Sequence, residues 1–213
     1  VIGMEFASIY SALGVKVTVL EYCREILPGF DTEIAKRLRM ALKRRGVTIV
    51  TSAQVTAIRD GGTVVEYEEK GRAKSLSAEK VMMAVGRRPV VPEGLEAAGV
   101  VTERGRIVTD ESMSTSVEGI YAIGDVNGRC MLAHAATVQG RVALGLQKLP
   151  ACIPAAVFTV PECGSVGLTA EQCAAQGIDA LEGKAIYRAN GKALAMDEPD
   201  GLAKIVVERA TGR

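Results

Sequence analysis

The stretch that most constrains the fold spans residues 120–134 and reads IYAIGDVNGRCMLAH. Its apolar start, residues 120–123, indicates a short strand, and a helix is expected from Ala133 to about Leu149. Between them stand Gly124 and Asp125. A strand that ends in Gly-Asp places a carboxylate at the carboxyl edge of a sheet, where doubly wound α/β folds bind cofactors. Alone, however, the same pair could form an ordinary turn.

A second motif precedes this stretch. Residues 84–89 read AVGRRP and match the pattern AxGRxP. They follow an apolar run, residues 80–84, that we expect to be a buried strand. The elements follow a specific order: a buried strand that ends in GRxP, then a strand that ends in GD, and then a helix. Chance is a poor explanation for this order. The two motifs together therefore favour a cofactor-binding α/β domain.

The first 50 residues predict alternating helices and strands. Residues 4–13 favour a short helix, and residues 15–20 (VKVTVL) favour a strand covered on both faces. Asp31 can then cap a second helix that ends at Gly46, and residues 47–50 predict another strand. Helix, strand, helix and strand with short connections are typical of a doubly wound sheet.

The remaining segments differ in character. Residues 53–69 predict a β-hairpin, because two β-rich runs flank Asp-Gly-Gly. Residues 90–118 carry turn residues throughout and are expected to connect other elements. Short β-rich pieces and one helix follow from residue 156 onward, which suggests the opening of an α+β domain.

Composition excludes several classes of protein. Apolar residues make up 48% of the chain, and 26 basic and 25 acidic residues give a net charge of +1. This balance argues against nucleic acid and anionic membranes as partners. No apolar run is long enough to span a membrane and no signal peptide is evident, so we expect a cytoplasmic protein. The five cysteines are scattered without a CxxC pair, which indicates no metal site.

A nucleotide site is indicated near the start of the chain. Gly3 heads the first expected helix, and Glu21 follows eighteen residues later at a strand end. A pyrophosphate can rest against the N–H groups of a helix start, and a carboxylate at the next strand end can bind ribose hydroxyls. That carboxylate would repel a 2′-phosphate, which favours NAD over NADP. Alone, Gly3 could serve packing, Glu21 could be solvated, and Arg24 could face a phosphate instead.

Taken together, the motifs resemble the pyridine nucleotide disulfide oxidoreductases, flavoproteins with FAD, NAD and interface domains. The resemblance rests on VIGMEFASIYSALGVKVTVLE (1–21), AVGRRP (84–89) and IYAIGDVNGRCMLAHAATVQGRVA (120–143). Within the family, MLAH (131–134) resembles the dihydrolipoamide dehydrogenases. IPAAVFTVPECGSVGLTAEQ (153–172) resembles the opening of the interface domain. Gln139 and Ala170 depart from the pattern, since Glu is common at both positions.

The resemblance implies an α/β fold with doubly wound, Rossmann-like FAD- and NAD-binding domains and the start of an α+β interface (dimerisation) domain. It assigns residues 1–86 to an NAD-binding domain without its first strand. Residues 87–150 become the C-terminal part of the FAD-binding domain, and residues 151–213 the start of the interface domain. Because the chain begins with Val1 rather than Met, we expect an internal piece of a longer protein.

The resemblance also implies the cofactor ligands. FAD and NAD are the expected cofactors, with backbone N–H groups of residues 131–134, at the start of the helix expected from Ala133, facing the flavin. The expected NAD-binding residues are Val1, Ile2, Gly3, Met4, Glu5, Glu21, Val55 and Gly86, and the expected FAD-binding residues are Asp125, Met131, Leu132, Ala133 and His134. No catalytic residue is expected in the chain, because the redox cysteine pair and the His/Glu base of the family would lie outside it. His134, the single histidine, is therefore not expected to be the base.

The implied activity is the oxidation of dihydrolipoamide by NAD through FAD and a redox disulfide. The implied partners are a lipoyl carrier protein or domain and a second copy of the same chain. Two alternatives stay open. One is a sibling FAD/NAD(P)H oxidoreductase, such as an NADH oxidase, a transhydrogenase or a mercuric reductase. The other is a non-catalytic NAD-binding module.

Overall fold

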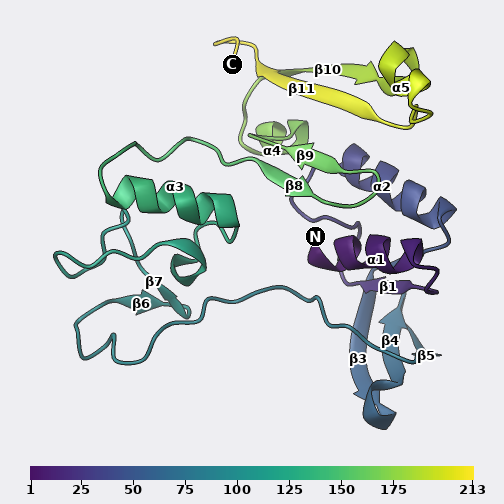
Figure 1. The fold of residues 1–213 in the computed structure, drawn as a ribbon, viewed down its shortest axis with the longest axis horizontal. Coiled ribbons are helices and arrows are strands. Elements are labelled where there is room, and N and C mark those ends of the chain that lie inside the picture. Colours follow the sequence, from purple (N-terminus) through teal and green to yellow (C-terminus); the bar gives the residue numbers. More distant parts are fainter. The chain divides into compact units, whose positions relative to one another are not determined.

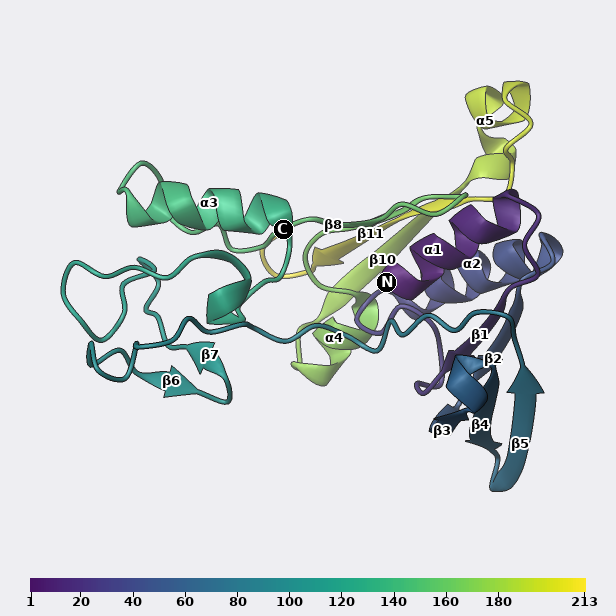
Figure 2. The ribbon, with the colours of Figure 1, turned by 60° about the horizontal axis from the view of Figure 1, so that its bottom comes forward.

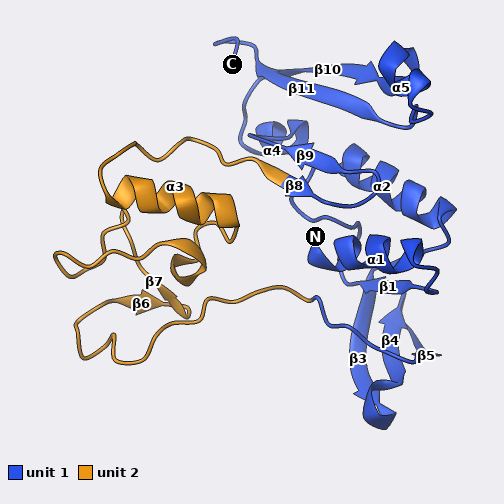
Figure 3. Ribbon diagram, in the orientation of Figure 1, with its two compact units in different colours: residues 1–84, 156–213 blue, residues 85–155 orange.

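The computed structural model describes residues 1–213, which form two compact units (Figure 3). The first unit joins Val1–Ala84 to Ala156–Arg213, and the second contains Val85–Ala155. The first unit thus combines two segments that are far apart in the sequence (Figure 1). The three-domain division at residues 86 and 150 stays a prediction.

The first segment of unit 1 alternates helices and strands in the expected order. It contains α1 (Ile2–Ala12), β1 (Thr18–Glu21), α2 (Thr32–Arg44) and β2 (Thr48–Thr51). The two strands are parallel and pair in register from Thr18 opposite Thr48 to Glu21 opposite Thr51. This parallel pair, with a helix between its strands, confirms the expected α/β order.

Helix α2 begins and ends where its sequence predicts. Asp31 Oδ1 accepts hydrogen bonds from the N–H groups of Glu33, at 2.9 Å, and Ile34, at 3.1 Å. Gly46 follows the last turn with φ of +89°, a conformation that glycine adopts without strain. The side-chain cap and the glycine satisfy backbone groups that the helix itself leaves unpaired.

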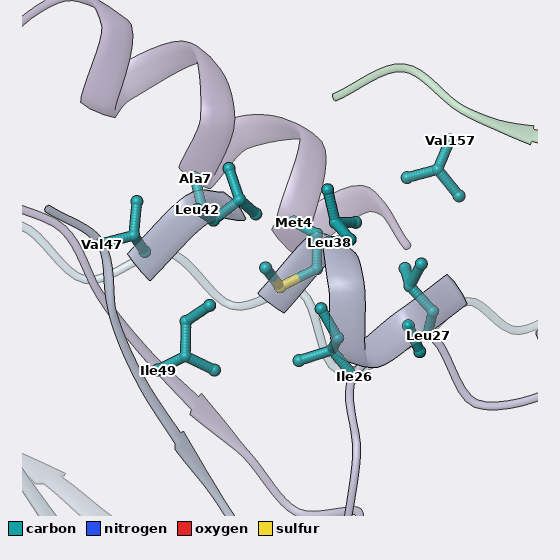
Figure 4. Close-up of a cluster of buried hydrophobic side chains, with 10 residues drawn as sticks. Met4, Ala7, Ile26, Leu27, Leu38, Leu42, Val47, Ile49 and Val157 are labelled. Atoms are coloured by element: carbon teal, nitrogen blue, oxygen red, sulfur yellow. The ribbon is translucent and has the colours of Figure 1, made fainter. Parts of the chain in front are cut away.

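The core of unit 1 lies between α1, α2 and the two parallel strands (Figure 4). Val157, which is fully buried, joins this core from the second segment of the unit. The second segment is therefore held to the first by hydrophobic packing as well as by polar contacts. The buried members are Met4, Ala7, Ile26, Leu27, Ala35, Leu38, Leu42, Val47, Ile49 and Val157.

The expected hairpin is part of a three-stranded antiparallel sheet. It consists of β3 (Ala53–Arg59), β4 (Val64–Glu69) and β5 (Arg72–Ser77), in that order (Figure 2). A bulge between Val55 and Ala57 interrupts the register of β3 with β4. Sequence reasoning found the first two strands and missed β5.

The second segment of unit 1 mixes short helices and strands, as expected. It contains β8 (Ala155–Val157), β9 (Cys163–Ser165), α4 (Ala170–Ala175), β10 (Ala180–Ile186), α5 (Gly191–Ala195) and β11 (Leu202–Glu208). Strands β10 and β11 form an antiparallel hairpin in which Lys184 lies opposite Lys204. A capping box between Thr169 and Gln172 begins α4.

Charged side chains connect this hairpin to the start of α2. Lys204 Nζ lies 2.8 Å from Asp31 Oδ2, 3.2 Å from Glu33 Oε2 and 3.3 Å from Glu182 Oε2. Lys184 Nζ lies 2.6 Å from Glu33 Oε2 and 3.1 Å from Glu182 Oε1. The Lys204 side chain is only 10% exposed, so its charge depends on these carboxylates for compensation.

Unit 2 contains little regular structure besides one helix. Its elements are β6 (Thr102–Glu103), β7 (Arg106–Ile107), a 3₁₀ turn (Gly124–Asn127) and α3 (Ala133–Ala143). Helix α3 ends at Ala143, earlier than the expected Leu149, because Leu144 leaves the helical conformation and Gly145 has φ of +70°. A small core forms from Val100, Ile107 and Ala122.

Two expected strands are absent. Residues 80–84 form no strand, and Met82 and Met83 are 47% and 73% exposed rather than buried. Residues 120–123 make only one isolated bridge, between Ser114 and Tyr121. Apolar sequence indicates a tendency to be buried, whereas a strand also needs a neighbour that pairs with its backbone, and no strand of the structure lies beside either run.

None of the helices is both long enough and apolar enough to pass through a bilayer.

Candidate cofactor-binding sites

The start of α1 has the features of an anion-binding helix terminus. Val1 is the N-cap residue and makes no side-chain hydrogen bond to the helix, so N–H groups of the first turn stay available. A Cβ on Gly3 would lie 3.1 Å from the Cβ of Ala84. Glycine therefore permits the close approach of this helix start to the segment that precedes the GRRP motif.

Two side chains of the predicted NAD set are already engaged within the chain. Met4 is buried in the core of unit 1, and its backbone N–H donates to the carbonyl oxygen of Val1 at 2.9 Å. Glu5 Oε1 accepts a hydrogen bond from the N–H of Phe158 at 2.9 Å. One turn later, Ser8 Oγ accepts from the N–H of Val160 at 3.1 Å. Helix α1 thus holds the segment around residue 158 in place.

Glu21 is the last residue of β1 and lies opposite the end of β2. Its Oε1 accepts a hydrogen bond from the N–H of Cys23 at 2.7 Å, which fixes the turn after the strand. The carboxylate retains acceptor capacity on Oε2 for a ligand hydroxyl. Burial, together with a hydrogen bond to Glu21 and the charge of that carboxylate, raises the pKa of the Cys23 thiol, which disfavours its reactive thiolate form.

A cavity of about 430 Å³ opens directly beyond Glu21. Its walls come from the turn after β1, from the start of β3 and from the β4–β5 turn. Tyr22, which follows Glu21, and Gln54, which precedes Val55, both line it, whereas Glu21 and Val55 themselves do not. Val55 itself is 44% exposed. The lining residues are Tyr22, Cys23, Arg24, Ser52, Gln54, Glu68, Lys70 and Gly71.

Sequence reasoning did not predict this cavity. Of its lining residues, only Arg24 was named as a possible ligand, for a phosphate. Its walls come from three turns that only the folded sheet brings together. The available signal was the position of Tyr22 and Gln54 beside Glu21 and Val55 in the sequence.

In unit 2, the GRRP and GD motifs meet. Asp125 Oδ2 lies 3.6 Å from Arg87 Nη2, and the two side chains are 44% and 61% exposed. Such an exposed pair adds little stability, so the Asp125 carboxylate is free to exchange this partner for a ligand hydroxyl. Gly124 has φ of +76°, which favours glycine directly before the carboxylate.

The start of α3 also offers free backbone N–H groups. Leu132 is the N-cap residue and provides no side-chain cap. Met131 and Leu132 are half-buried, and Ala133 and His134 are exposed. His134 Nε2 donates a hydrogen bond to the carbonyl oxygen of Pro154 at 2.7 Å. Because a carbonyl can only accept, Nε2 carries the proton, and the ring is held beside the helix start.

Other reactive groups form no centre of their own. Gly86 has φ of +118° and lies in unit 2, and its expected place beside NAD stays a prediction. All five cysteines are free. No cluster of three His, Cys, Asp or Glu side chains could hold a metal ion.

Two features are typical of the dinucleotide-binding class of proteins: a parallel α/β pair with an uncapped helix start, and a Gly-Asp turn near a second uncapped helix. The family model described as "Pyridine nucleotide-disulphide oxidoreductase" matches residues 1–140, and that of the family's dimerisation domain matches residues 153–213. The chain belongs to the pyridine nucleotide-disulphide oxidoreductases. The match confirms the predicted family and fold class.

Curated relatives carry the name dihydrolipoyl dehydrogenase. The chain is 41% identical to the Geobacillus stearothermophilus protein over 221 residues, and 40% identical to a Bacillus subtilis protein over 223 residues. Each match covers 99% of this chain and 47% of the relative. The chain thus spans about half the length of the curated relatives it matches.

Solved structures show the same family likeness. One is the HOCl-induced flavoprotein disulfide reductase RclA from Escherichia coli, with a TM-score of 0.85 and 31% identity, covering 100% of this chain and 51% of that chain. Another is LpdA from Mycobacterium tuberculosis, with a TM-score of 0.85 and 32% identity, covering 99% of this chain and 48% of that chain.

Proposed function

We propose that this chain supplies NAD-binding elements and part of the FAD-binding elements of a dihydrolipoamide dehydrogenase. The observation that carries the proposal is the identity of about 40% to dihydrolipoyl dehydrogenases over nearly the whole chain. The complete enzyme would oxidise dihydrolipoamide on a lipoyl carrier protein or domain with NAD. A homodimer and a cytoplasmic location belong to the same proposal, and the dimerisation-domain match supports the former.

The residues of unit 1 fit NAD. The free N–H groups at the start of α1 would hold the pyrophosphate, with Gly3 allowing the close approach. Glu21 Oε2 would accept hydrogen bonds from the adenosine ribose hydroxyls, and Val55 would lie beside the adenine. A 2′-phosphate would meet the negative charge of Glu21, so NAD is preferred to NADP. For Gly86, which lies in unit 2, a place facing the nicotinamide half rests on the family likeness alone.

The residues of unit 2 fit FAD. Asp125 would bind hydroxyls of the ribityl chain, and the N–H groups from Met131 to His134 would face the flavin. The flavin, when bound, supplies the electron transfer between the dithiol substrate and NAD. The start of α3 would contribute electrostatics, because the positive end of a helix favours a negative charge placed beside it. The redox cysteines and the His/Glu base are not among the residues of this chain.

A sibling flavoprotein is the second candidate. It is favoured by the likeness to RclA, a disulfide reductase at 31% identity with a TM-score of 0.85. An NADH oxidase, a transhydrogenase or a mercuric reductase would bind both nucleotides through the same elements. Substrate specificity, which depends on groups outside this chain, separates these enzymes from a dihydrolipoamide dehydrogenase.

Turnover of the natural full-length protein tests the proposal. We expect visible flavin absorbance and reduction of NAD that depends on added dihydrolipoamide. A flavoprotein without that turnover would be a sibling enzyme. A protein that lacks flavin absorbance, and does not gain it with added FAD, would be a non-catalytic NAD-binding module.

A further inference from the structure

Behind the Gly124–Asp125 turn lies a buried pair of side-chain amides. Asn127 is 2% exposed and Gln139, in α3, is 3% exposed. Gln139 Oε1 accepts two hydrogen bonds, from the N–H of Gly124 at 2.7 Å and from Asn127 Nδ2 at 2.8 Å. A single oxygen on α3 therefore fixes the backbone immediately before Asp125.

Asn127 extends this pair in both directions along the chain. Its Nδ2 also donates to the Ala122 carbonyl at 3.0 Å, and its Oδ1 accepts from the N–H of Arg129 at 3.0 Å. Both amide hydrogens of Asn127 are thereby used. The network joins the segment before the turn, the turn itself, the loop toward α3 and the helix.

The two ends of this network carry the groups assigned to FAD. Asp125 directly follows Gly124, and the start of α3 lies less than two helical turns before Gln139. The carboxylate side chain is exposed, and its only ion pair is the long one to Arg87. Gln139 is the one side chain that hydrogen-bonds to the backbone of Gly124. The spacing between the carboxylate and the free N–H groups of α3 thus depends on this amide oxygen.

We propose that Gln139 is a positioning residue for FAD, which it serves by holding Asp125 at a fixed place relative to the start of α3. This inference rests on the proposed function. An acceptor oxygen is the essential feature, because both partners of Oε1 are donors. A glutamate oxygen could accept the same two bonds, whereas an apolar side chain of similar size would leave two buried donors without a partner.

Three variants of the full-length protein test the proposal. Gln139→Met keeps the size of the side chain and removes the acceptor, and Gln139→Glu keeps the acceptor. Gln147→Met is the matched control, because the Gln147 oxygen accepts only from the exposed Arg141 side chain, at 3.0 Å. The measurements are the Kd of FAD for each apoenzyme, by quenching of flavin fluorescence, and the Tm without FAD.

Gln139→Met should raise the Kd of FAD about tenfold, the effect of one lost buried hydrogen bond or more. Gln139→Glu and Gln147→Met should bind FAD within about threefold of the wild type. If Gln139→Met does not fold, retention of FAD by Gln139→Glu still supports the proposal, and loss of FAD from Gln139→Glu overturns it.

Other outcomes also overturn the inference. Gln139→Met could bind FAD like the wild type, with or without a lower Tm, which would give Gln139 a purely structural role. A wild-type protein that binds no FAD would contradict the proposed function itself. A wild type and a Gln139→Met variant that bind FAD with the same Kd would contradict only this inference.

Discussion

Among single residues, Glu21 is the one that we expect to determine the preference for NAD over NADP. One carboxylate oxygen holds the N–H of Cys23, and the other remains for a ligand. In the full-length protein, Glu21→Ala should raise the Kd of NADH about tenfold, because charge-assisted hydrogen bonds to the ribose are lost. The preference for NADH over NADPH should shrink as well, since the repulsion of a 2′-phosphate disappears. Fluorescence titration with both nucleotides measures the change.

The control for Glu21 is Glu103→Ala, which removes an exposed glutamate from β6 in the other unit. It should leave both nucleotide affinities unchanged. An equal affinity of the wild type for NADPH and NADH would contradict the assignment. Arg24, in the cavity wall, would then be the residue that meets a phosphate.

Sequence reasoning placed Glu21 at the end of a strand, as in the structure, but did not indicate the contact of Glu5 with Phe158. A carboxylate at a strand end is visible in the sequence, because strand boundaries follow from local composition. The contact of Glu5 with Phe158 joins residues 153 positions apart, and no local pattern indicates it. The same holds for Gln139, whose departure from the family pattern was visible but whose partners were not.

At the scale of elements, α2 is the central support of unit 1. Leu38 is 1% exposed in the core, whereas Met40 on the same helix is 49% exposed. Leu38→Ala should lower the free energy of unfolding by about 2–5 kcal/mol, through lost burial and the cavity that remains. Met40→Ala should change it by about 0.5 kcal/mol or less. Urea unfolding followed by circular dichroism measures both, and equal losses would contradict the assigned core.

Elements were predictable where local chemistry defines their ends. Asp31 and Gly46 mark α2 in the sequence, and the structure confirms both. Residues 80–84 have the same apolar character as a buried strand, yet they remain unpaired. The difference is physical, because a helix pairs with itself and a strand depends on a neighbour far away in sequence.

The charges between α2 and the β10–β11 hairpin predict a dependence of stability on pH. Hydrogen bonds from Lys184 and Lys204 lower the pKa of Glu33 to about 2. Burial acts to raise the pKa of Asp31, but the hydrogen bond and charge of Lys204, together with the hydrogen bonds from the N–H groups of Ile34 and Glu33, outweigh it, so this pKa is lowered too. Burial likewise opposes the charge of Lys204, whose carboxylate partners nevertheless raise its pKa.

The direction of the pH effect follows from these shifts. Carboxylates with a lowered pKa stabilise the fold above their unfolded pKa, near 4.5 for Glu33, and lose this effect as the pH falls toward about 2. The raised pKa of Lys204 contributes fully below its ordinary value of 10.5 and is lost only at higher pH. Stability from the network should therefore be complete at pH 7 and reduced at pH 3.

Lys204→Met tests this dependence in the full-length protein. It should lower the free energy of unfolding clearly at pH 7 and less at pH 3, where the partner carboxylates begin to take up protons. Lys192→Met, at an exposed position of α5 without an ion pair, is the control. A loss that is the same at both pH values would show that Lys204 acts through packing alone.

At the scale of the whole molecule, we expect a homodimer. The match of residues 153–213 to a dimerisation domain is the basis of this prediction. Light scattering coupled to gel filtration should give twice the monomer mass for the full-length protein at micromolar concentration, and the mass should persist in high salt if the interface is apolar. A monomer at all concentrations would contradict it.

The hairpin β10–β11 has a consequence for the order in which the molecule folds. Its register places Lys184 opposite Lys204, and like charges directly across a ladder repel each other. Glu182, on the hairpin, offsets only part of this repulsion, and the other carboxylates, Asp31 and Glu33, arrive with α2. We therefore expect the strands of this hairpin to pair stably only once the first segment has folded. During synthesis, the first segment emerges earlier, so it is available for the second segment to pack against.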